Sequence, residues 1–203
     1  MAATDRLIAD NSLGELLDSL AAHTPAPGGG TAAAVAAASA AALVQMAARF
    51  TEGREDHADA HARMSEVIAR ADELRARLVE LAEVELHAFE PVLDAIRLPR
   101  DDPDRGDRVA GALSNAAESP MGISRAAAEL AGLGAELAET GAPRLVGDAV
   151  TAAVLGEGAC VAAGRLAQIN LAAFADDPRL TEVSNLTAAA AAARTRALDA
   201  KQS

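Results

Sequence analysis

Three consecutive glycines before a long apolar stretch are the residues best suited to chemistry in this sequence. They lie in the segment Pro27, Gly28, Gly29, Gly30 and Thr31. Glycines at a helix start let another group approach the backbone closely and leave free N–H groups aimed at one point. With the helix dipole, such amides form a site for an anion or a carbonyl oxygen. The segment would equally serve as a tight turn that lets two Ala-rich helices pack.

Several familiar sites do not fit the sequence. No Gly-Lys-Ser/Thr follows the glycines, so they are not a Walker loop, and no strand precedes them, so they are not a dinucleotide fingerprint. His57 and His61 would share a helix face, but the segment between them lacks the metalloprotease Glu, so a solvated pair is expected and no metal site is predicted. Cys160 is the only cysteine, which excludes an internal disulfide and predicts inert packing.

The elements that position the glycine segment are predicted to be helices. The chain is 51% hydrophobic but only 1% aromatic, and Ala, the best helix former, is abundant. Ser12 and Glu15 form a capping-box pattern at a helix start. Pro91 should kink or break a long helix. The glycines at positions 156, 158 and 164 should mark close contacts between helices. The expected helices cover residues 12–23, 32–50, 56–98, 108–118, 119–140, 146–174 and 180–200.

An Ala-rich core gains less hydrophobic free energy per residue than a Leu-rich one, although it lets helices approach closely. Burial between subunits would compensate, so an oligomer is expected. The predicted fold is therefore all-α: one domain over residues 1–203, built as a bundle of long, mostly antiparallel Ala-rich helices that dimerises. The uncharged stretch at residues 31–48 is interpreted as a buried helix of this bundle rather than a membrane span, because it holds few Leu, Ile or Phe.

The charge balance limits the ligands and partners. A formal charge of −12 argues against nucleic acid and anionic membranes as partners. Lys201 is the only lysine, so an anionic ligand must be met by arginines, backbone N–H groups or helix N-termini. The N-terminus has no basic and apolar regions of a signal peptide, so a cytoplasmic location is expected.

Residues 26–31, which lead straight into an Ala-rich helix, resemble the Pro-Gly-Gly-Gly-Ser/Thr motif of the cyclodeaminase family. That family includes the C-terminal part of formiminotransferase-cyclodeaminase and stand-alone methenyltetrahydrofolate cyclohydrolases. The resemblance extends over about residues 12 to 178. Further family motifs follow in the expected order at residues 50–54, 83–89, 96–99, 147–148 and 169–171.

The resemblance implies a formiminotetrahydrofolate cyclodeaminase or methenyltetrahydrofolate cyclohydrolase. Both reactions need a carboxylate to stabilise positive charge or move a proton, and neither needs a metal or nucleotide. Asp148 and Glu85 are the implied catalytic acids, although either would otherwise be an ordinary solvated or ion-paired carboxylate. A carboxyl buried among so many Ala side chains would have a raised pKa.

The substrate implied by the resemblance is a tetrahydrofolate derivative, with no permanently bound cofactor, and the implied assembly is a homodimer. The implied substrate-binding residues are the 27–31 segment, Arg54 and Asn170. Arg54 would otherwise be a surface arginine. Asn170 offers amide donors and an acceptor to the pterin, and would equally satisfy a buried backbone group.

The sequence also departs from the family pattern. Glu85 stands where the family usually has Asp, Ala142 stands in place of an Asn, and Leu166 stands in place of a second Asn. These departures leave an alternative function open: a catalytically degenerate helical dimer that binds a ligand or a protein partner.

Overall fold

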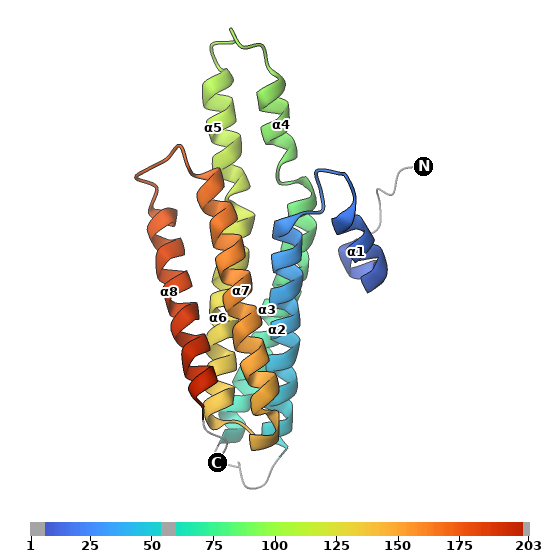
Figure 1. Cartoon of the computed structure of the whole chain (residues 1–203), viewed down its shortest axis with the longest axis vertical. Helices are drawn as coiled ribbons and strands as arrows, with labels where there is room; N and C mark the ends of the chain where they lie inside the picture. Colours follow the sequence, from blue (N-terminus) through green and yellow to red (C-terminus); the bar gives the residue numbers. More distant parts are fainter. Residues whose placement is uncertain (1–6, 54–59, 201–203) are drawn as a thin grey trace.

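The computed structural model describes residues 7–53 and 60–200, and over these residues the chain is helical with no strand. Figure 1 shows the long helices packed side by side along one axis, with α4 and α5 extending beyond one end of the bundle and α1 on its flank. The predicted all-α fold is confirmed. The long helices are α2 (Gly29–Glu52), α3 (His61–His87), α6 (Glu118–Thr140), α7 (Val146–Asn170) and α8 (Pro178–Asp199). The short elements are η1 (Ile8–Asp10), α1 (Leu13–Ala21), α4 (Glu90–Arg97), α5 (Arg105–Ala116) and η3 (Pro143–Leu145).

The predicted helix boundaries are confirmed where local signals are strong. Ser12 caps α1 with the expected capping box to Glu15. The helix predicted over residues 56–98 is broken beside Pro91, one of the two effects expected of this proline: α3 ends at His87 and α4 begins at Glu90, with Pro91 in its first turn. Proline lacks an N–H and tolerates the first turn of a helix, so it begins α4 here rather than kinking one continuous helix.

Small residues allow the helix axes to approach closely in the core. Along α2, fully buried positions are mostly alanines, and α2 packs against α3 and α7. Gly156 of α7 lies against the α6 backbone, where an added Cβ would be 2.8 Å from Ala131 N. A Cβ at Gly164 would be 2.8 Å from Val183 Cγ1 of α8. The predicted close contacts are therefore confirmed at these two glycines. At Gly158 the prediction is wrong within one subunit, because an added Cβ would meet nothing within 4 Å.

Gly134 of α6 provides a direct test of this close packing. A Cβ there would lie 2.7 Å from Ala153 N and 3.0 Å from Ala149 O, both backbone atoms of α7 that cannot rotate away. Gly134→Ala is expected to lower the free energy of unfolding by about 2 kcal/mol, as overpacking of a close helix contact typically does. Urea unfolding at a fixed protein concentration measures the change.

Gly132→Ala is the matched control, because position 132 lies in the same helix with no atom within 4 Å of an added Cβ. Ala is the better helix former, so this variant should be neutral or stabilised by up to about 1 kcal/mol. Equal destabilisation of the two variants would show that the α6–α7 contact does not require glycine.

The bundle surface is unevenly charged. Ion pairs connect α3 to α6 through Arg70 and Glu129, and α6 to α8 through Arg125 and Glu182. In contrast, α2 and the Pro143–Asn170 stretch are long and apolar enough to cross a membrane by length and composition alone. Their apolar windows are only 56% and 39% buried in the bundle, respectively. The large apolar side chains exposed on α7 are Val154, Val161 and Ile169.

Candidate functional site

A cavity of about 700 Å³ opens at the end of the bundle where α2 begins. This volume lies within the usual range for small-molecule sites. Four segments contribute to it: the glycine turn before α2, the end of α3, the start of α4 and the last turns of α7. The lining residues are 25–30, 85–90, Leu93, Leu166, Ile169 and Asn170. The whole Pro27–Gly30 part of the predicted site therefore lines one cavity together with Glu85 and Asn170, while Thr31 lies just behind it.

Glu85 and Gly30 are in direct contact across this cavity. Gly30 is buried in the first turn of α2, and the Glu85 side chain from α3 occupies the space where a side chain at position 30 would lie. A Cβ at Gly30 would overlap the Glu85 carboxyl group. Position 30 therefore requires glycine because a functional group approaches the backbone there. The sequence left this interpretation open beside that of simple helix packing.

Buried oxygen atoms without hydrogen-bond partners lie around this contact. Glu85 Oε1, Ser119 Oγ and Thr31 Oγ1 are inaccessible to solvent and make no hydrogen bond of ordinary geometry within the described part of the chain. Each unpaired buried group of this kind costs about 1–3 kcal/mol. Of the three residues, Glu85 lines the cavity, whereas Ser119 and Thr31 are not part of its lining.

The environment of Glu85 shifts its protonation. Burial raises the pKa of the Glu85 carboxyl above its ordinary value, and the neighbouring Ser119 hydroxyl partly offsets the rise. The predicted effect of burial on a carboxyl pKa is therefore found at Glu85. A carboxyl with a raised pKa holds its proton to a higher pH and is a stronger base than an ordinary glutamate, which suits general acid–base catalysis.

The first turn of α2 adds free amides to the site. Gly28 is the N-cap and offers no side chain to cap the helix, and the first bond of the turn is donated by Ala32 N to Gly28 O at 3.0 Å. The N–H groups of Gly29, Gly30 and Thr31 consequently have no carbonyl partner within the helix. They carry the positive end of the α2 dipole and favour a negatively charged or carbonyl group of a ligand.

Asn170 combines the two roles that the sequence left open. Its Nδ2 donates to Ala116 O at 3.0 Å, so the side chain satisfies a backbone carbonyl near the end of α5. The same residue lines the cavity from the last turn of α7. The bond to Ala116 holds the amide in one orientation, with its oxygen as the group left for a ligand.

Asp148 and Glu85, the two implied catalytic acids, do not lie together within one subunit. Asp148 lies in the first turn of α7 and Asn170 is its last residue. At 1.5 Å per residue they are about 33 Å apart, so Asp148 is at the opposite end of the bundle from the cavity. The order of motifs in the sequence does not show the direction in which each helix runs. Arg54, another predicted binding residue, lies outside the described residues.

The site also holds residues to which the sequence analysis assigned no catalytic or binding role. Ser119 was treated only as a helix start, although it lies beside the Glu85 carboxyl. Apolar walls come from Phe89, Leu93 and Ile169. Phe89 and Ile169 fall within the family motifs at residues 83–89 and 169–171, whereas Leu93 lies in none of them. His87 lines the cavity and its Nδ1 is 2.9 Å from Glu90 Oε1. The spacing of three residues between His87 and Glu90 was a signal that could have revealed this pair.

The raised pKa of Glu85 predicts a specific dependence of stability on pH. The pKa of Glu85 in the folded protein lies above its value in the unfolded chain, which is about 4.3. At a pH between these two pKa values, the folded protein therefore binds more protons than the unfolded chain. The free energy of unfolding contributed by this group therefore falls as pH rises through that window. Glu85→Gln should raise the midpoint of thermal unfolding by about 2 °C at pH 8, with the difference vanishing near pH 4.

Glu83→Gln, two residues earlier in α3, removes a charge outside the cavity lining and should not reproduce this pH-dependent gain. Differential scanning calorimetry from pH 4 to pH 8 makes the comparison. A Glu85→Gln variant that is less stable than the parent at pH 8 would contradict the burial of an ionised carboxylate.

Comparison with known proteins extends over nearly the whole chain. The model of the formiminotransferase-cyclodeaminase family matches residues 12–192. A methenyltetrahydrofolate cyclohydrolase of Methylorubrum extorquens is 29% identical over 189 residues, which are 89% of this chain and 90% of the relative. The crystal structure of formiminotetrahydrofolate cyclodeaminase from Thermotoga maritima has a TM-score of 0.83 at 28% identity, covering 94% of this chain and 95% of that one.

A formimidoyltransferase-cyclodeaminase of Rattus norvegicus is 30% identical over 179 residues, which are 85% of this chain but 33% of the longer relative. The resemblance of the glycine segment and the motifs that follow it is thus confirmed by matches in sequence and in fold. The chain belongs to the formiminotransferase-cyclodeaminase family.

Proposed function

We propose that this protein is a folate one-carbon enzyme of the formiminotetrahydrofolate cyclodeaminase or methenyltetrahydrofolate cyclohydrolase type. The observation that carries the proposal is the partly buried Glu85 carboxyl, which lies over Gly30 inside a cavity with free amides at its edge. Full-length similarity to relatives with these two activities supports the same assignment. Both reactions have 5,10-methenyltetrahydrofolate on one side, so one binding site serves either.

In the cyclodeaminase reaction, N10 of 5-formiminotetrahydrofolate attacks the formimino carbon, and the bond from that carbon to the terminal nitrogen breaks. The formimino group reacts in its protonated form, with two hydrogens on the terminal nitrogen; N10 loses a proton and that nitrogen gains one, leaving as ammonia, while the positive charge passes to the methenyl product. Glu85 is placed to accept the first proton and return it to the leaving nitrogen, because its raised pKa suits both steps. The resulting methenyl cation is stabilised by the carboxylate.

In the cyclohydrolase reaction, water attacks the cationic carbon of 5,10-methenyltetrahydrofolate. The carboxylate of Glu85 accepts a proton from the water, and the bond from this carbon to N5 then breaks while N5 takes up a proton. The product is 10-formyltetrahydrofolate, with one proton released overall. The same carboxyl therefore performs the proton transfers of both reactions.

The cavity offers separate contacts for different parts of a reduced folate. Phe89, Leu93 and Ile169 provide apolar walls for rings, and Asn170 provides an amide for the pterin edge. The N–H groups at the start of α2 attract a carbonyl or carboxylate of the substrate. We further propose that the protein is a cytoplasmic homodimer and needs no permanently bound cofactor.

Two assays on the purified protein test the function. One follows loss of methenyltetrahydrofolate absorbance against the spontaneous rate of hydrolysis, and the other follows ammonia release from 5-formiminotetrahydrofolate. Acceleration of either reaction supports the proposal and distinguishes the two activities. Calorimetric binding of a reduced folate without any acceleration would instead favour the degenerate binding protein, and absence of both binding and turnover would reject a folate site.

A further inference from the structure

The chain passes from α5 to α6 without a loop, and we call residues 114–119 the α5–α6 junction. Ala117 both ends α5 and begins α6, with helical backbone angles. Pro120 follows as the third residue of α6, and it has no N–H to donate to Ala116 O four residues earlier. The carbonyl of Ala116 therefore lacks its usual helical partner, and the junction must be held by groups from other elements.

Two residues of the candidate site depend on this junction for their position. Ala116 O accepts the hydrogen bond from Asn170 Nδ2 at 3.0 Å, which orients the amide that lines the cavity. Ser119, three residues further along the chain, is buried and lies beside the Glu85 carboxyl. A movement of the junction would therefore displace the partners of both Asn170 and Glu85.

Arg179 binds the junction from the first turn of α8. Its Nη1 donates to Ser114 O at 3.0 Å and to Glu118 Oε1 at 2.5 Å, and its Nη2 donates to Ser114 Oγ at 2.7 Å. Ser114 lies two residues before Ala116, and Glu118 lies directly before Ser119. The guanidinium thus holds the junction on both sides of the carbonyl that binds Asn170.

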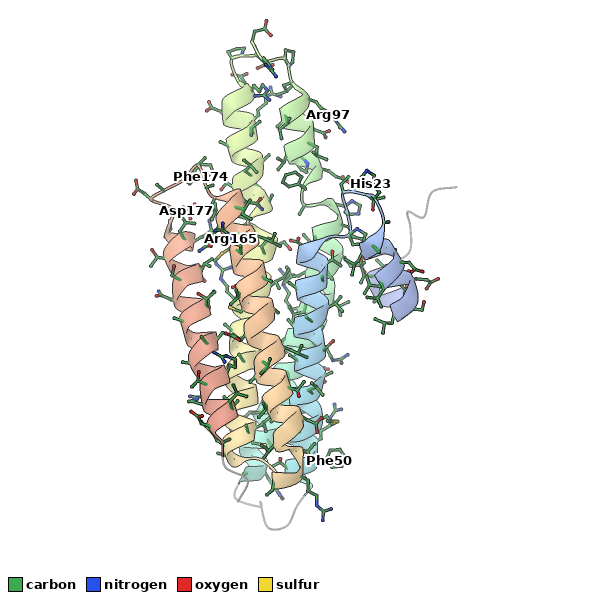
Figure 2. All side chains as sticks on the ribbon, viewed as in Figure 1. His23, Phe50, Arg97, Arg165, Phe174 and Asp177 are labelled. Atoms are coloured by element: carbon green, nitrogen blue, oxygen red, sulfur yellow. The ribbon has the colours of Figure 1, made fainter. Side chains whose placement is uncertain are left out.

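Asp177 fixes the guanidinium from the opposite direction, and we call Arg179 with Asp177 the α8 clamp. Asp177 Oδ1 accepts from Arg179 Nε at 3.0 Å, and Oδ2 accepts from Nη2 at 2.7 Å. Asp177 is also the N-cap of α8, because Oδ1 accepts from Arg179 N at 2.9 Å. Figure 2 shows Asp177 at the start of α8, at the end of the bundle beyond which α5 extends. All five N–H groups of the guanidinium therefore meet an acceptor.

The α8 clamp is largely buried and keeps its charge. The side chains of Arg179 and Asp177 are only 17% and 15% exposed. The hydrogen bonds from Arg179 lower the pKa of Asp177 to about 2, and the same pairing raises the pKa of Arg179 above its ordinary value. Neither group changes its charge in the neutral range. An ion pair with every donor used favours a single geometry, which suits a part that must hold other residues in place.

We propose that Arg179 is a positioning residue for the reaction, which clamps the α5–α6 junction so that Ser119 stays against Glu85. The same clamp holds Ala116 O where Asn170 reaches it. Arg179 does not line the cavity, so it acts through the junction and not on the substrate. Its role in catalysis rests on the proposed function. In this arrangement α8, which contributes no residue to the cavity lining, takes part in organising the site.

Arg179→Lys tests the positioning role while keeping the positive charge. A lysine ammonium is a compact point charge and cannot form the five directed bonds of the guanidinium. Ser119 should then move away from the Glu85 carboxyl, which removes the contact that partly offsets the rise in the pKa of that group. The rising limb of the pH–activity profile should therefore shift to higher pH. On the plateau, kcat/KM should fall about tenfold because site groups are misplaced.

Ser119→Ala shows whether the effect passes through Ser119. This variant removes the hydroxyl beside Glu85 and should shift the rising limb in the same direction. Because both changes remove one contact, the variant that combines Arg179→Lys with Ser119→Ala should shift the limb no further than Ser119→Ala alone. A further shift in the double variant would contradict a route through Ser119.

The other charged groups around Glu85 are the same in every variant. His87 and Glu90 belong to the cavity lining, and Glu118 belongs to the junction. On α7, Arg165 adjoins the lining, and the first turns of α2 contain no charged residue. A difference between the profiles therefore reports the geometry that Arg179 maintains.

Arg125→Lys is the matched control. Arg125 joins the same two helices, α6 and α8, through hydrogen bonds to Glu182 at 2.5 and 2.7 Å. It lies six residues beyond Ser119, outside the junction. Its kcat/KM should stay within about threefold of the parent, with the limb in place. Equal rate losses in the two lysine variants with an unmoved limb would show that Arg179 only ties helices together, and would overturn the proposal.

Asp177→Asn decides the question if Arg179→Lys does not fold. Asn is as good an N-cap as Asp, so the start of α8 should persist, whereas the guanidinium loses the carboxylate that orients it. The limb should again shift to higher pH. Parent activity with an unmoved limb in this variant would overturn the proposal.

A measurement without substrate separates this proposal from the proposed function. Carbon-13 NMR of the carboxyl groups, with the Glu85 signal assigned by its absence in Glu85→Gln, gives the pKa of Glu85 in the free protein. This pKa should be higher in Arg179→Lys than in the parent and unchanged in Arg125→Lys. If the parent turns over neither folate, the proposed function fails. An unchanged pKa of Glu85 in Arg179→Lys would overturn the positioning role whatever the activity.

Discussion

Glu85→Gln is expected to lower kcat/KM by about 10²–10⁴-fold in whichever folate reaction the enzyme catalyses, because the amide cannot carry the proton that both reactions move. The substitution keeps the size of the side chain, so the cavity and its contact with Gly30 should persist. Substrate affinity should change far less than the rate of the chemical step. Single-turnover kinetics, with binding measured separately by calorimetry, distinguishes the two effects.

The pH profile should identify Glu85 as the group responsible. For hydrolysis the carboxylate must be ionised to accept a proton from water, so activity rises with pH through the pKa of Glu85. Because burial raises that pKa, the rising limb should lie above the range of an ordinary glutamate. Glu85→Gln should lose this limb, and Glu85→Asp should retain it at a reduced rate, because its carboxyl is one methylene shorter.

Glu83→Gln is the control for these effects, since it lies in the same helix but does not line the cavity. Its kcat/KM should stay within about threefold of the parent, in line with a side chain outside the reaction. A rate loss in Glu83→Gln equal to that of Glu85→Gln would assign the effect to the charge of α3 as a whole.

Gly30→Ala should reduce activity at least about 100-fold while leaving the protein folded. The added Cβ overlaps the carboxyl group of Glu85, and this flexible side chain can move away at little cost to the fold. Ala is also favoured over Gly in a helix by about 1 kcal/mol, so the unfolding midpoint should not fall. The variant should therefore lose activity without losing stability. A simple packing role for Gly30 would not predict this combination.

A double-mutant cycle shows whether Gly30 acts through Glu85. The variant that combines Gly30→Ala with Glu85→Gln should be no slower than Glu85→Gln alone, because both changes remove the same positioned carboxyl. Gly14→Ala in α1, where an added Cβ meets nothing within 4 Å, is the matched glycine control and should retain activity. Multiplicative losses in the double variant would mean that Gly30 contributes by a separate route, for example through its amide.

Sequence reasoning predicted the site in part, and the outcome differs for each residue. Pro27 to Gly30, Glu85 and Asn170, which were predicted from separate motifs, lie around one cavity. Ser119 was missed because its partner, Glu85, is 34 residues earlier in the chain and on another helix. Asp148 was grouped with Glu85 from motif order, which carries no information about the end of the bundle at which a residue lies.

The sequence by itself determined the helices, the start of α2 and the chemical groups available. Helix propensity, prolines and caps act over a few residues, so they can be interpreted locally, as the capping box at Ser12 illustrates. Only the tertiary structure decided that Glu85 is buried over Gly30 and that Asp148 lies at the far end of α7. Both depend on the length, direction and packing of whole helices. A pKa shift by burial, likewise, exists only once the surrounding helices have excluded water.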